Sequence, residues 1–405
     1  MSENSTSQTK MSQVEFVALM AFCVSLTALS IDAMLPALGI IASDLSLTDP
    51  NDAQLVVGIQ FAGMTIGQAL AGPLSDSWGR KRAMYGGLLV FSIGSLLAMT
   101  ASNFTVLLFG RALQGAGASA PRVVSNAIVR DQYEGRPMAR VLSLIATVFI
   151  IVPVIAPLVG QGILAVATWR TIFGFLLFQG LFAFLWFAWR QKETLPANLR
   201  IPFSLSQIGN AAGETMKTKI SFGYMLVAGL SSGGFIGYLS SSRQILQDQY
   251  GVGDLFPLYF AVLALSVGTA SLCNAKLVLR MGMTKLCIAA QTALTVTSIV
   301  FLFTAFAFKG HPPLWLLMSF FMIVFFCLGI LFGNCTARAM EPLGHIAGTA
   351  SAVFAAVTTL ISSGFGILIG RAYDGTIIPL VAGFAILGVI AQAVLRWTER
   401  NPEAS

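Results

Sequence analysis

Long apolar runs separated by short polar segments fill almost the whole chain. Twelve such runs can be counted, each about as long as the roughly 20 residues that a helix needs to cross a bilayer. Their approximate limits are residues 16–40, 54–75, 83–101, 104–128, 141–163, 169–189, 221–241, 256–275, 285–308, 313–335, 347–369 and 376–395. None alternates like a barrel strand, and a lone strand cannot satisfy its backbone in lipid. The pattern therefore predicts an all-α, polytopic membrane protein with twelve transmembrane helices.

Composition agrees with a membrane protein. The chain has 405 residues, of which 56% are hydrophobic and only 10% are charged, whereas a soluble domain is about 25% charged. The net charge of +7 could suggest nucleic acid in a soluble protein. Here the basic residues lie mostly in short loops between spans, where the positive-inside rule explains them more simply. We expect a lipid bilayer, and no nucleic acid, as the surroundings of this chain.

The distribution of basic residues predicts the orientation. With a cytoplasmic N-terminus, the inside segments hold 18 Lys and Arg residues and the outside segments hold 4. This imbalance predicts that both termini are cytoplasmic. The first span is too long for the apolar core of a signal peptide and has no small-residue cleavage site behind it, so we expect it to remain uncleaved.

The longest polar segment divides the spans six and six. It predicts an N-terminal six-helix half over residues 1–189, a cytoplasmic linker over 190–220 and a C-terminal six-helix half over 221–405. The linker is equally consistent with a short interfacial helix and with a flexible tether. Weak similarities between the halves predict two pseudo-symmetric bundles, an arrangement that many secondary transporters share, with a substrate site at the midplane between the halves.

Asp32 is the acidic residue that can be placed deep inside an apolar span. An ionisable group at that depth costs several kcal/mol, so it is a functional-site hypothesis by default. The alternative is a structural aspartate that is protonated or paired with an arginine.

Two arginines interrupt the fourth span. Arg111 and Arg122 are eleven residues apart, which is about three helical turns plus 20°, so they share one face. Cations on a membrane helix must face a wet cavity or a counter-charge, and Asp32 is the available acid. Arg122 is close enough to the span end to snorkel, and a functional role and snorkelling are equally open for it.

The loop between spans 2 and 3 combines glycines with charges. Gly72, Asp76, Gly79, Arg80 and Lys81 follow one another within ten residues. Glycines permit a tight turn between helices, and the aspartate can accept from the basic residues or from a helix N-terminus. A charge cluster that forms in one conformation and breaks in another would serve as a conformational switch. The alternative is an ordinary positive-inside loop.

The fifth span carries Pro153 and Pro157, followed by Gly160. Two prolines four residues apart predict a bent helix, and the glycine gives it a thin face for close packing. A passive kink is the alternative.

Other motifs are missing from the sequence. His311 and His345 lie in loops without further ligands at metal spacing, so no metal site is predicted. The chain has no G-x-x-x-x-G-K-[ST] and no H-E-x-x-H pattern, which argues against an ATP-driven pump and a membrane zinc protease. The five cysteines lie in or at the ends of apolar spans and are interpreted as free packing thiols. We expect neither a cofactor nor an enzymatic activity.

Four stretches together resemble the major facilitator superfamily, and within it the twelve-span drug:proton antiporters of the bicyclomycin/chloramphenicol-resistance type. Residues 72–82 resemble its signature loop, 107–117 its R-x-x-Q-G motif, 153–162 its antiporter motif and 31–36 the acidic motif of drug exporters. The resemblance covers about residues 14–400. Two departures are Ser77, where the family usually has a basic residue, and Ala156, where it usually has glycine.

The resemblance implies a function and a set of roles. The chain would be a proton-coupled exporter of small lipophilic drugs, phenicol-like or bicyclomycin-like, working as a monomer by alternating access in a bacterial plasma (inner) membrane. Asp32 and Arg111 would couple protons, residues 72–81 would form the switch loop and Pro153, Pro157 and Gly160 the antiporter helix. Candidate substrate contacts are Phe61, Gln114, Arg122, Phe149, Phe235 and Tyr238.

Two rival functions stay open. One is a transporter of a specific endogenous metabolite with incidental drug export, although the spans offer few paired polar groups for a polar solute. The other is a membrane enzyme or sensor, for which no catalytic constellation is present.

Overall fold

The computed structural model describes residues 11–400, except for the side chains of Ala139, Phe149 and Ile150. Lys10, which the charge argument counted, lies outside this range. The long helices of the described chain are α1 (Gln13–Asp32), α3 (Leu55–Trp78), α4 (Arg80–Met99), α5 (Phe104–Gln132), α6 (Gly135–Val166), α7 (Trp169–Arg190), α9 (Lys219–Arg243), α10 (Phe256–Met281), α11 (Met283–Ala307), α12 (Leu314–Met340), α13 (Ala347–Arg371) and α14 (Ile378–Glu399). Two shorter helices are α2 (Leu38–Asp44) and α8 (Leu205–Lys217). The described residues contain no strand.

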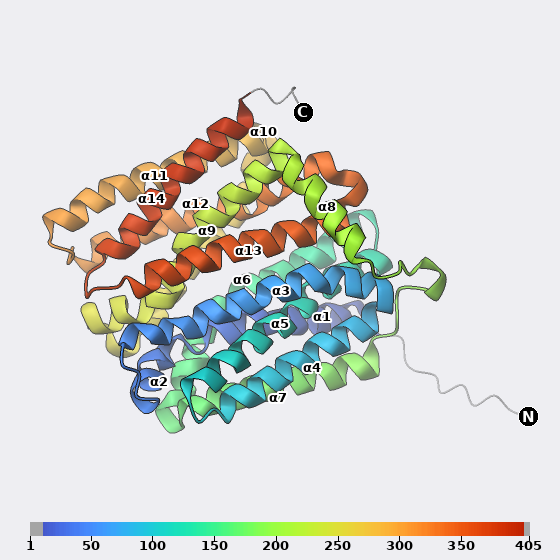
Figure 1. Ribbon diagram of the computed structural model, residues 1–405, viewed down its shortest axis with the longest axis horizontal. Helices are drawn as coiled ribbons and strands as arrows, with labels where there is room; N and C mark the ends of the chain where they lie inside the picture. The colour runs from blue at the N-terminus through green and yellow to red at the C-terminus, as the bar shows by residue number, and fades with distance from the viewer. Residues whose placement is uncertain (1–10, 401–405) are drawn as a thin grey trace, which may run out of the picture.

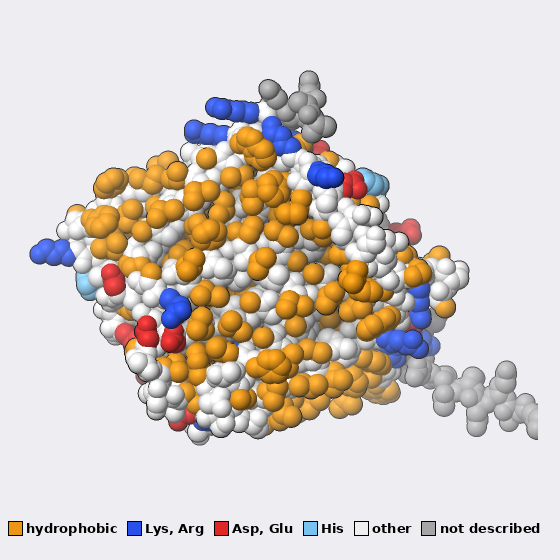
Figure 2. All heavy atoms as spheres, viewed as in Figure 1, with side chains coloured by type: hydrophobic (Ala, Val, Ile, Leu, Met, Phe, Trp, Pro, Cys, Tyr) orange, Lys and Arg blue, Asp and Glu red, His pale blue; other side chains and the backbone are white. Residues whose placement is uncertain are grey.

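These twelve long helices confirm the predicted all-α fold, and each overlaps one predicted span. Ten stretches of the described chain are long and apolar enough to cross a membrane. One of them contains both α12 and α13. Helix α5 falls outside the ten because its arginines, glutamine and glycines lower its hydropathy. Figure 2 shows hydrophobic side chains over most of the visible face, with most charged side chains toward its margins.

The helices pack as two groups in chain order. Helices α1, α3, α4, α5, α6 and α7 contact one another, as do α9 to α14. The extensive contacts between the groups are α3 against α13 and α6 against α10. In Figure 1 the blue-to-green group lies below the yellow-to-red group, with α3 and α13 side by side at the border.

The segment between the two groups contains the short helix that the sequence left open. Helix α8 begins after Ser204, whose side chain accepts a hydrogen bond from the Gln207 amide at 3.3 Å. This is ordinary N-capping by a serine. The helix packs against α13 and α9 and marks one end of the molecule (Figure 1). This end is called the α8 end below.

Candidate functional site

Helix α1 stops at Asp32 because of the sequence that follows. Pro36 has no backbone N–H, so it cannot bond the carbonyl of Asp32 four residues earlier, and its ring disfavours a continued helix. The chain passes into a 3-10 turn, η1 (Leu35–Ala37), before α2 begins. The Asp32 carboxyl is therefore held at a helix break inside the bundle.

The Asp32 side chain is buried and unpaired. The residue is 5% exposed, and within residues 11–400 its carboxyl forms no hydrogen bond and no ion pair. It lies within electrostatic range of the Tyr238 hydroxyl on α9, which belongs to the other group of helices. An unpaired charge at membrane depth is costly, so a carboxyl in this position is suited to bind and release a proton as its surroundings change.

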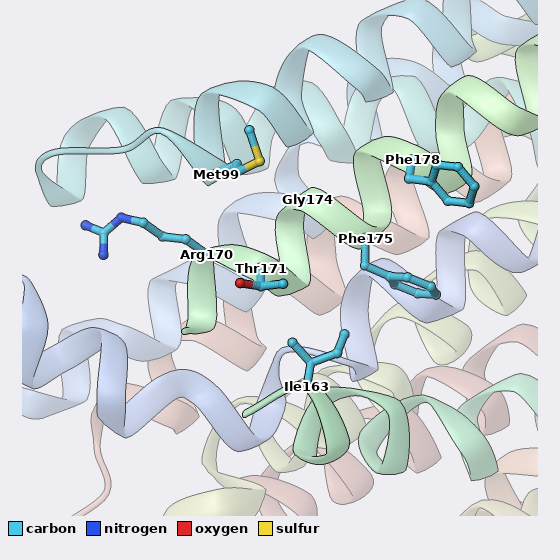
Figure 3. Close-up of a pocket in the computed structure, with 7 residues that line it drawn as sticks. All are labelled: Met99, Ile163, Arg170, Thr171, Gly174, Phe175 and Phe178. Atoms are coloured by element: carbon cyan, nitrogen blue, oxygen red, sulfur yellow. The ribbon is translucent and has the colours of Figure 1, made fainter. Parts of the chain in front are cut away.

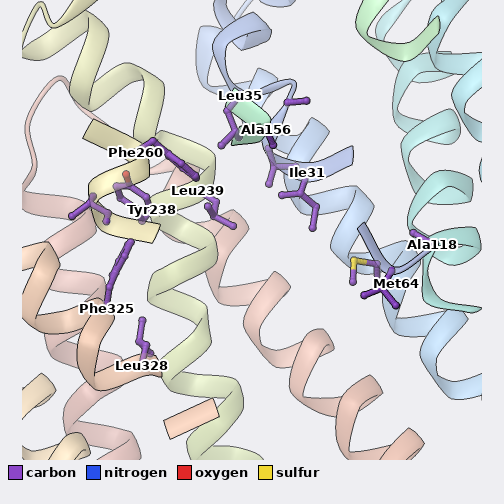
Figure 4. Packing of buried hydrophobic residues seen from close by; sticks show 14 of the residues in the cluster. Ile31, Leu35, Met64, Ala118, Ala156, Tyr238, Leu239, Phe260, Phe325 and Leu328 are labelled. Atoms are coloured by element: carbon purple, nitrogen blue, oxygen red, sulfur yellow. The ribbon is translucent and has the colours of Figure 1, made fainter. Parts of the chain in front are cut away.

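Tyr238 lies in an aromatic cluster that faces the break in α1. Its ring centroid is 4.9 Å from those of Phe321 and Phe325 and 6.1 Å from that of Phe260. Figure 4 shows Tyr238, Phe260 and Phe325 of this cluster on one side and Ile31 and Leu35 on the other. The Tyr238 hydroxyl is buried without a hydrogen-bond partner in the described chain. A buried tyrosine hydroxyl usually finds a partner, so this unpaired one is an exception.

Arg111 lies at the centre of a buried hydrogen-bond network in the first group of helices. Its Nε donates to the Val56 carbonyl at 3.0 Å, and its Nη1 donates to the Ser30 carbonyl at 3.0 Å and to Gln114 Oε1 at 2.5 Å. Its Nη2 donates to Gln60 Oε1. The planar guanidinium with its fork of donors suits such a set of acceptors.

The network extends one residue further on each side. Gln60 Nε2 donates to Ser30 Oγ at 2.6 Å, and Gln114 Nε2 donates to Ser95 Oγ at 2.8 Å. The guanidinium also lies over the Phe173 ring, 5.6 Å from its centroid. The side chains thereby tie α1, α3, α4 and α5 together, two residues before Asp32. The sequence interpretation missed Gln60, Ser30 and Ser95, although polar residues inside apolar spans were a visible signal.

Asp32 was the expected counter-charge for Arg111, but the structure pairs Arg111 with neutral acceptors instead. Arg111 is fully buried, and its partners are the neutral carbonyls and amides above, not the Asp32 carboxylate. Arg122, on the same helix, is exposed. The inference that both arginines need a wet cavity or an acid was therefore wrong for Arg111, because four neutral acceptors satisfy it. Gln114, a candidate substrate contact, is fully buried and engaged with Arg111 and Ser95 in this state.

Helix α6, which carries Pro153, Pro157 and Gly160, meets the break in α1 directly. Both prolines lie inside the continuous helix α6. Gly160 packs so closely on the Ala33 carbonyl that a Cβ at this position would overlap the carbonyl oxygen. The backbone of Ala33, the residue after Asp32, is therefore fixed against α6. A shift of α6 would change the position of Asp32.

Residues 72–81 form a charge cluster at the α8 end. Gly79, with φ +97°, turns the chain from α3 into α4. The Arg80 guanidinium pairs with Asp76 and, through Nε, with Asp131 Oδ2 at 2.9 Å. Gly72 lies beside Ala352 of α13, since a Cβ on the glycine would be 3.8 Å from that of the alanine.

The segment after α7 docks on this loop. Glu193 Oε1 and Oε2 accept the backbone N–H groups of Arg80 and Lys81 at 2.9 and 3.1 Å, a favourable place for an acid at a helix N-terminus. Ser77 Oγ accepts the Phe203 amide at 3.1 Å. The serine that departs from the family pattern therefore anchors the linker.

The remaining aromatic candidates lie in different places. Phe61 on α3 is half-buried against the core. Phe235 makes edge contacts with Phe325 and Phe332, with centroids 5.3 and 6.1 Å apart. The side chain of Phe149 lies outside the described part of the structure.

Hydrogen bonds between the two groups gather at the end opposite α8. Gln244 Nε2 donates to Asn51 Oδ1 at 2.8 Å, and Asn51 Nδ2 donates to the Tyr373 carbonyl at 2.9 Å. Arg371 pairs with Asp52 at 2.8 Å. Nearer the middle, Thr359 donates to Gln68 at 2.8 Å.

A cavity of about 500 Å³ is a mainly apolar groove between α4, α6 and α7. In Figure 3 its lining side chains Met99, Ile163, Phe175 and Phe178 surround the groove. A further cavity, of about 330 Å³, lies between the two groups of helices at the end opposite α8. Within the described residues no group of three or more His, Cys, Asp or Glu side chains could hold a metal ion.

Comparison with known proteins defines the class. The sequence model of the Major Facilitator Superfamily matches residues 20–367. "Uncharacterized MFS-type transporter YdgK" of Bacillus subtilis (strain 168) is 33% identical over 92% of each chain. "Bicyclomycin resistance protein homolog" of Haemophilus influenzae is 28% identical over 95% of this chain and 96% of that one. "Multidrug resistance protein MdtL" of Salmonella heidelberg is 28% identical over 89% and 90%.

Solved structures show the same fold. A peptide transporter, POT, solved in complex with sulfate, has a TM-score of 0.72 at 16% identity and covers 96% of this chain and 94% of that one. A D-xylose-proton symporter has a TM-score of 0.71 at 14% identity, covering 97% and 99%. The family model and the 33% identical relative show that the chain is a multi-pass membrane transporter. It belongs to the Major Facilitator Superfamily, as the four sequence motifs indicated.

Proposed function

We propose that this transporter exports small lipophilic drugs in exchange for protons, with Asp32 as the proton carrier. The observation that carries the proposal is the buried, unpaired Asp32 carboxyl at the break of α1, facing Tyr238 across the two groups of helices. Protonation from outside and drug binding from inside would compete for this position. Arg111 acts as a positioning residue, because its hydrogen bond to the Ser30 carbonyl fixes the backbone two residues before Asp32.

The surroundings of Asp32 support a lipophilic substrate. Opposite it lie the rings of Tyr238, Phe260, Phe321 and Phe325, with one hydroxyl unengaged. Apolar and aromatic walls with few polar groups are typical of sites for drug-sized molecules. Relatives named for bicyclomycin and multidrug resistance support the same substrate class.

Alternating access would move residues 1–189 against residues 221–405, with 190–220 as the cytoplasmic linker. The basic loops favour a cytoplasmic α8 end and an outer opposite end, with both termini cytoplasmic in a bacterial plasma membrane and the transporter monomeric. In this orientation the Asn51, Gln244 and Tyr373 contacts close the outer end. The described state is then one in which the outer gate is shut.

The test uses inverted membrane vesicles energised to an acid interior. Phenicols, bicyclomycin and lipophilic cations are added, and release of the proton gradient is followed by fluorescence. We expect a response to some of these compounds with wild type and with Asp49→Asn, and none with Asp32→Asn. Asp49 is a matched control because it is an exposed acid in a loop.

Two results would contradict the proposal. An unchanged response from a folded Asp32→Asn variant would remove Asp32 from the coupling path. Silence of the folded wild-type protein toward every compound would instead favour a carrier of an endogenous metabolite.

A further inference from the structure

The 500 Å³ groove lies between α6 and α7, where the two helices separate. Helix α6 packs chiefly on α1 and α10 and only lightly on α7. On α7 the groove follows one stripe, through Gly174, Phe175 and Phe178, and Ile163 of α6 faces it. Outside its own helix, a Cβ on Gly174 would lie within 4 Å of one described atom, the Met99 sulfur at 3.2 Å. The glycine therefore leaves space that a larger side chain would fill.

The groove opens on the surface that faces lipid. Phe178 is 66% exposed, and the large apolar side chains beside it, Leu158 on α6 and Phe182 on α7, are also exposed. Helix α7 is long and apolar enough to cross a membrane, so such side chains contact acyl chains. The stretch from Arg170 to Phe178 covers about 12 Å at 1.5 Å per residue. A lipid hydrocarbon chain is the apolar body that this position offers to the groove.

An ion pair lies at one end of the groove. Figure 3 shows Arg170 at the end away from Phe178. Arg170 Nη1 donates to Asp44 Oδ2 at 2.6 Å, and its Nη2 donates to the Ala101 carbonyl at 3.0 Å. Trp169 Nε1 donates to the same Asp44 oxygen at 2.9 Å. The arginine side chain is 35% exposed and the aspartate side chain 45%.

Both members of the ion pair have hydrogen-bonding capacity left. A guanidinium has five N–H donors, and two contacts are made by that of Arg170 within the described chain. The Asp44 Oδ1 accepts no hydrogen bond from the described residues, because both donors bond Oδ2. A cation and an anion thus stand side by side, each able to take a further partner.

The ion pair lies at the level of the lipid headgroups. Helix α7 begins with Trp169 at the end opposite α8 (Figure 1), and tryptophan is enriched at the membrane–water interface. A phosphate could accept from Arg170, and an ammonium with N–H donors could donate to Asp44. A trimethylammonium group has no such donor. A headgroup with a phosphate and no cation would bring its charge close to the Asp44 carboxylate.

We propose that this groove binds a phospholipid whose zwitterionic headgroup carries a primary ammonium, as phosphatidylethanolamine does. Its phosphate accepts from Arg170, its ammonium donates to Asp44 Oδ1, and one acyl chain lies on Gly174 and Phe175. The chain fills the space between α6 and α7 and so supports α6, the helix that contacts the break in α1. Only the assignment to the outer leaflet rests on the orientation proposed above.

The headgroup is tested by native mass spectrometry of the purified, full-length protein. Phosphatidylethanolamine, phosphatidylcholine and phosphatidylglycerol with identical acyl chains are added one at a time. We expect the first to bind about three- to fivefold more tightly than the other two, the range of part-exposed ion pairs. Asp44→Asn should abolish this preference. Asp49→Asn, an exposed acid outside the groove, is the matched control and should retain it.

The chain site is tested by filling the groove. Gly174→Leu places a side chain where the acyl chain would lie, and we expect it to weaken phosphatidylethanolamine binding about tenfold. Gly86→Leu on α4 is the matched control, since nothing lies within 4 Å of a Cβ there. It should bind this lipid as wild type does. Equal binding of the three lipids to wild type, or unchanged binding in Gly174→Leu, would overturn the proposal.

A measurement on the wild-type protein keeps the inference falsifiable if a variant misfolds. Phosphatidylethanolamine with a diazirine in its acyl chain is photolysed with the protein in liposomes, and labelled peptides are identified by mass spectrometry. Labels within residues 163–178 that excess phosphatidylethanolamine prevents better than phosphatidylcholine would support the site. Labels confined to other segments, or equal competition by the two lipids, would overturn it. Lipid binding is measured without drug, so its failure is distinct from a failure of the export function.

Discussion

Arg111 and Asp32 are both ionisable and both buried, and they lie close together, since Arg111 donates to the Ser30 carbonyl two residues before Asp32. They differ in whether their polar atoms have hydrogen-bond partners. Arg111 donates to four neutral acceptors from α1, α3 and its own helix. Asp32 has no hydrogen-bond or ion-pair partner among the described residues. A fully satisfied buried group holds the structure in one arrangement. An unsatisfied one is free to change its proton or its partner. This difference supports the proposal that the arginine positions the backbone and that the aspartate carries the proton.

The largest effect on stability is expected when the hydrogen-bond network of Arg111 is disrupted. Arg111→Lys removes the planar fork and leaves at least two buried acceptors without a donor. We expect a loss on the order of 3 kcal/mol in the free energy of unfolding, measured as a lower melting temperature of purified protein. Arg130→Lys, an exposed change on the same helix, should stay within about 0.5 kcal/mol of wild type. Equal melting temperatures for the two variants would show that the network does not hold the bundle.

An intermediate loss of stability is expected at the contact between Gly160 of α6 and the Ala33 carbonyl. Gly160→Ala places a Cβ onto the Ala33 carbonyl, so the helices must separate, at a cost of about 1–3 kcal/mol. Drug efflux should fall with it, because the break that holds Asp32 shifts. Gly162→Ala is the matched control, since nothing lies within 4 Å of its Cβ. Efflux by the Gly160→Ala variant at the wild-type rate would separate this contact from the function of Asp32.

The smallest effect on stability is expected for a substitution beside Asp32, the buried group without a partner. Tyr238→Phe removes a hydroxyl that has no partner, so stability should change by less than about 0.5 kcal/mol. The pH profile of drug transport should nevertheless shift, because the hydroxyl lies within electrostatic range of Asp32. A profile that superimposes on that of wild type would exclude Tyr238 from the site.

Tyr250→Phe serves as the control for this variant. Its hydroxyl donates to the Pro312 carbonyl at 2.6 Å, so its loss should cost about 1 kcal/mol. Burial raises the pKa of Tyr250 to about 12, so this phenol stays neutral over the pH range of the assay. We therefore expect lower stability with an unchanged pH profile, the reverse of Tyr238→Phe.

The helices could be predicted from the sequence because the membrane imposes a strong pattern. Hydropathy located all twelve, but the first span was predicted to reach residue 40, whereas α1 ends at Asp32 because Pro36 interrupts the helix. Helix α5 shows the limit of a hydropathy criterion, because Arg111 and Gln114 lower its mean hydropathy. The same two residues stabilise the helix in the bundle through hydrogen bonds to Gln60, Val56 and Ser95.

The site could be predicted only in part. Asp32 and Arg111 stood out because a charge in an apolar span is rare, but their partners did not. Tyr238 is 206 positions from Asp32, and only the packing of the two groups of helices brings them together.

The central claim is that Asp32 gives up a proton when drug binds. The direct test is to add chloramphenicol to weakly buffered, purified transporter and to record proton release with a pH indicator. The account predicts a release that saturates with drug in wild type and in Asp49→Asn, and no release in a folded Asp32→Asn variant that still binds drug. Equal proton release from wild type and Asp32→Asn would contradict it, because another group would then carry the proton.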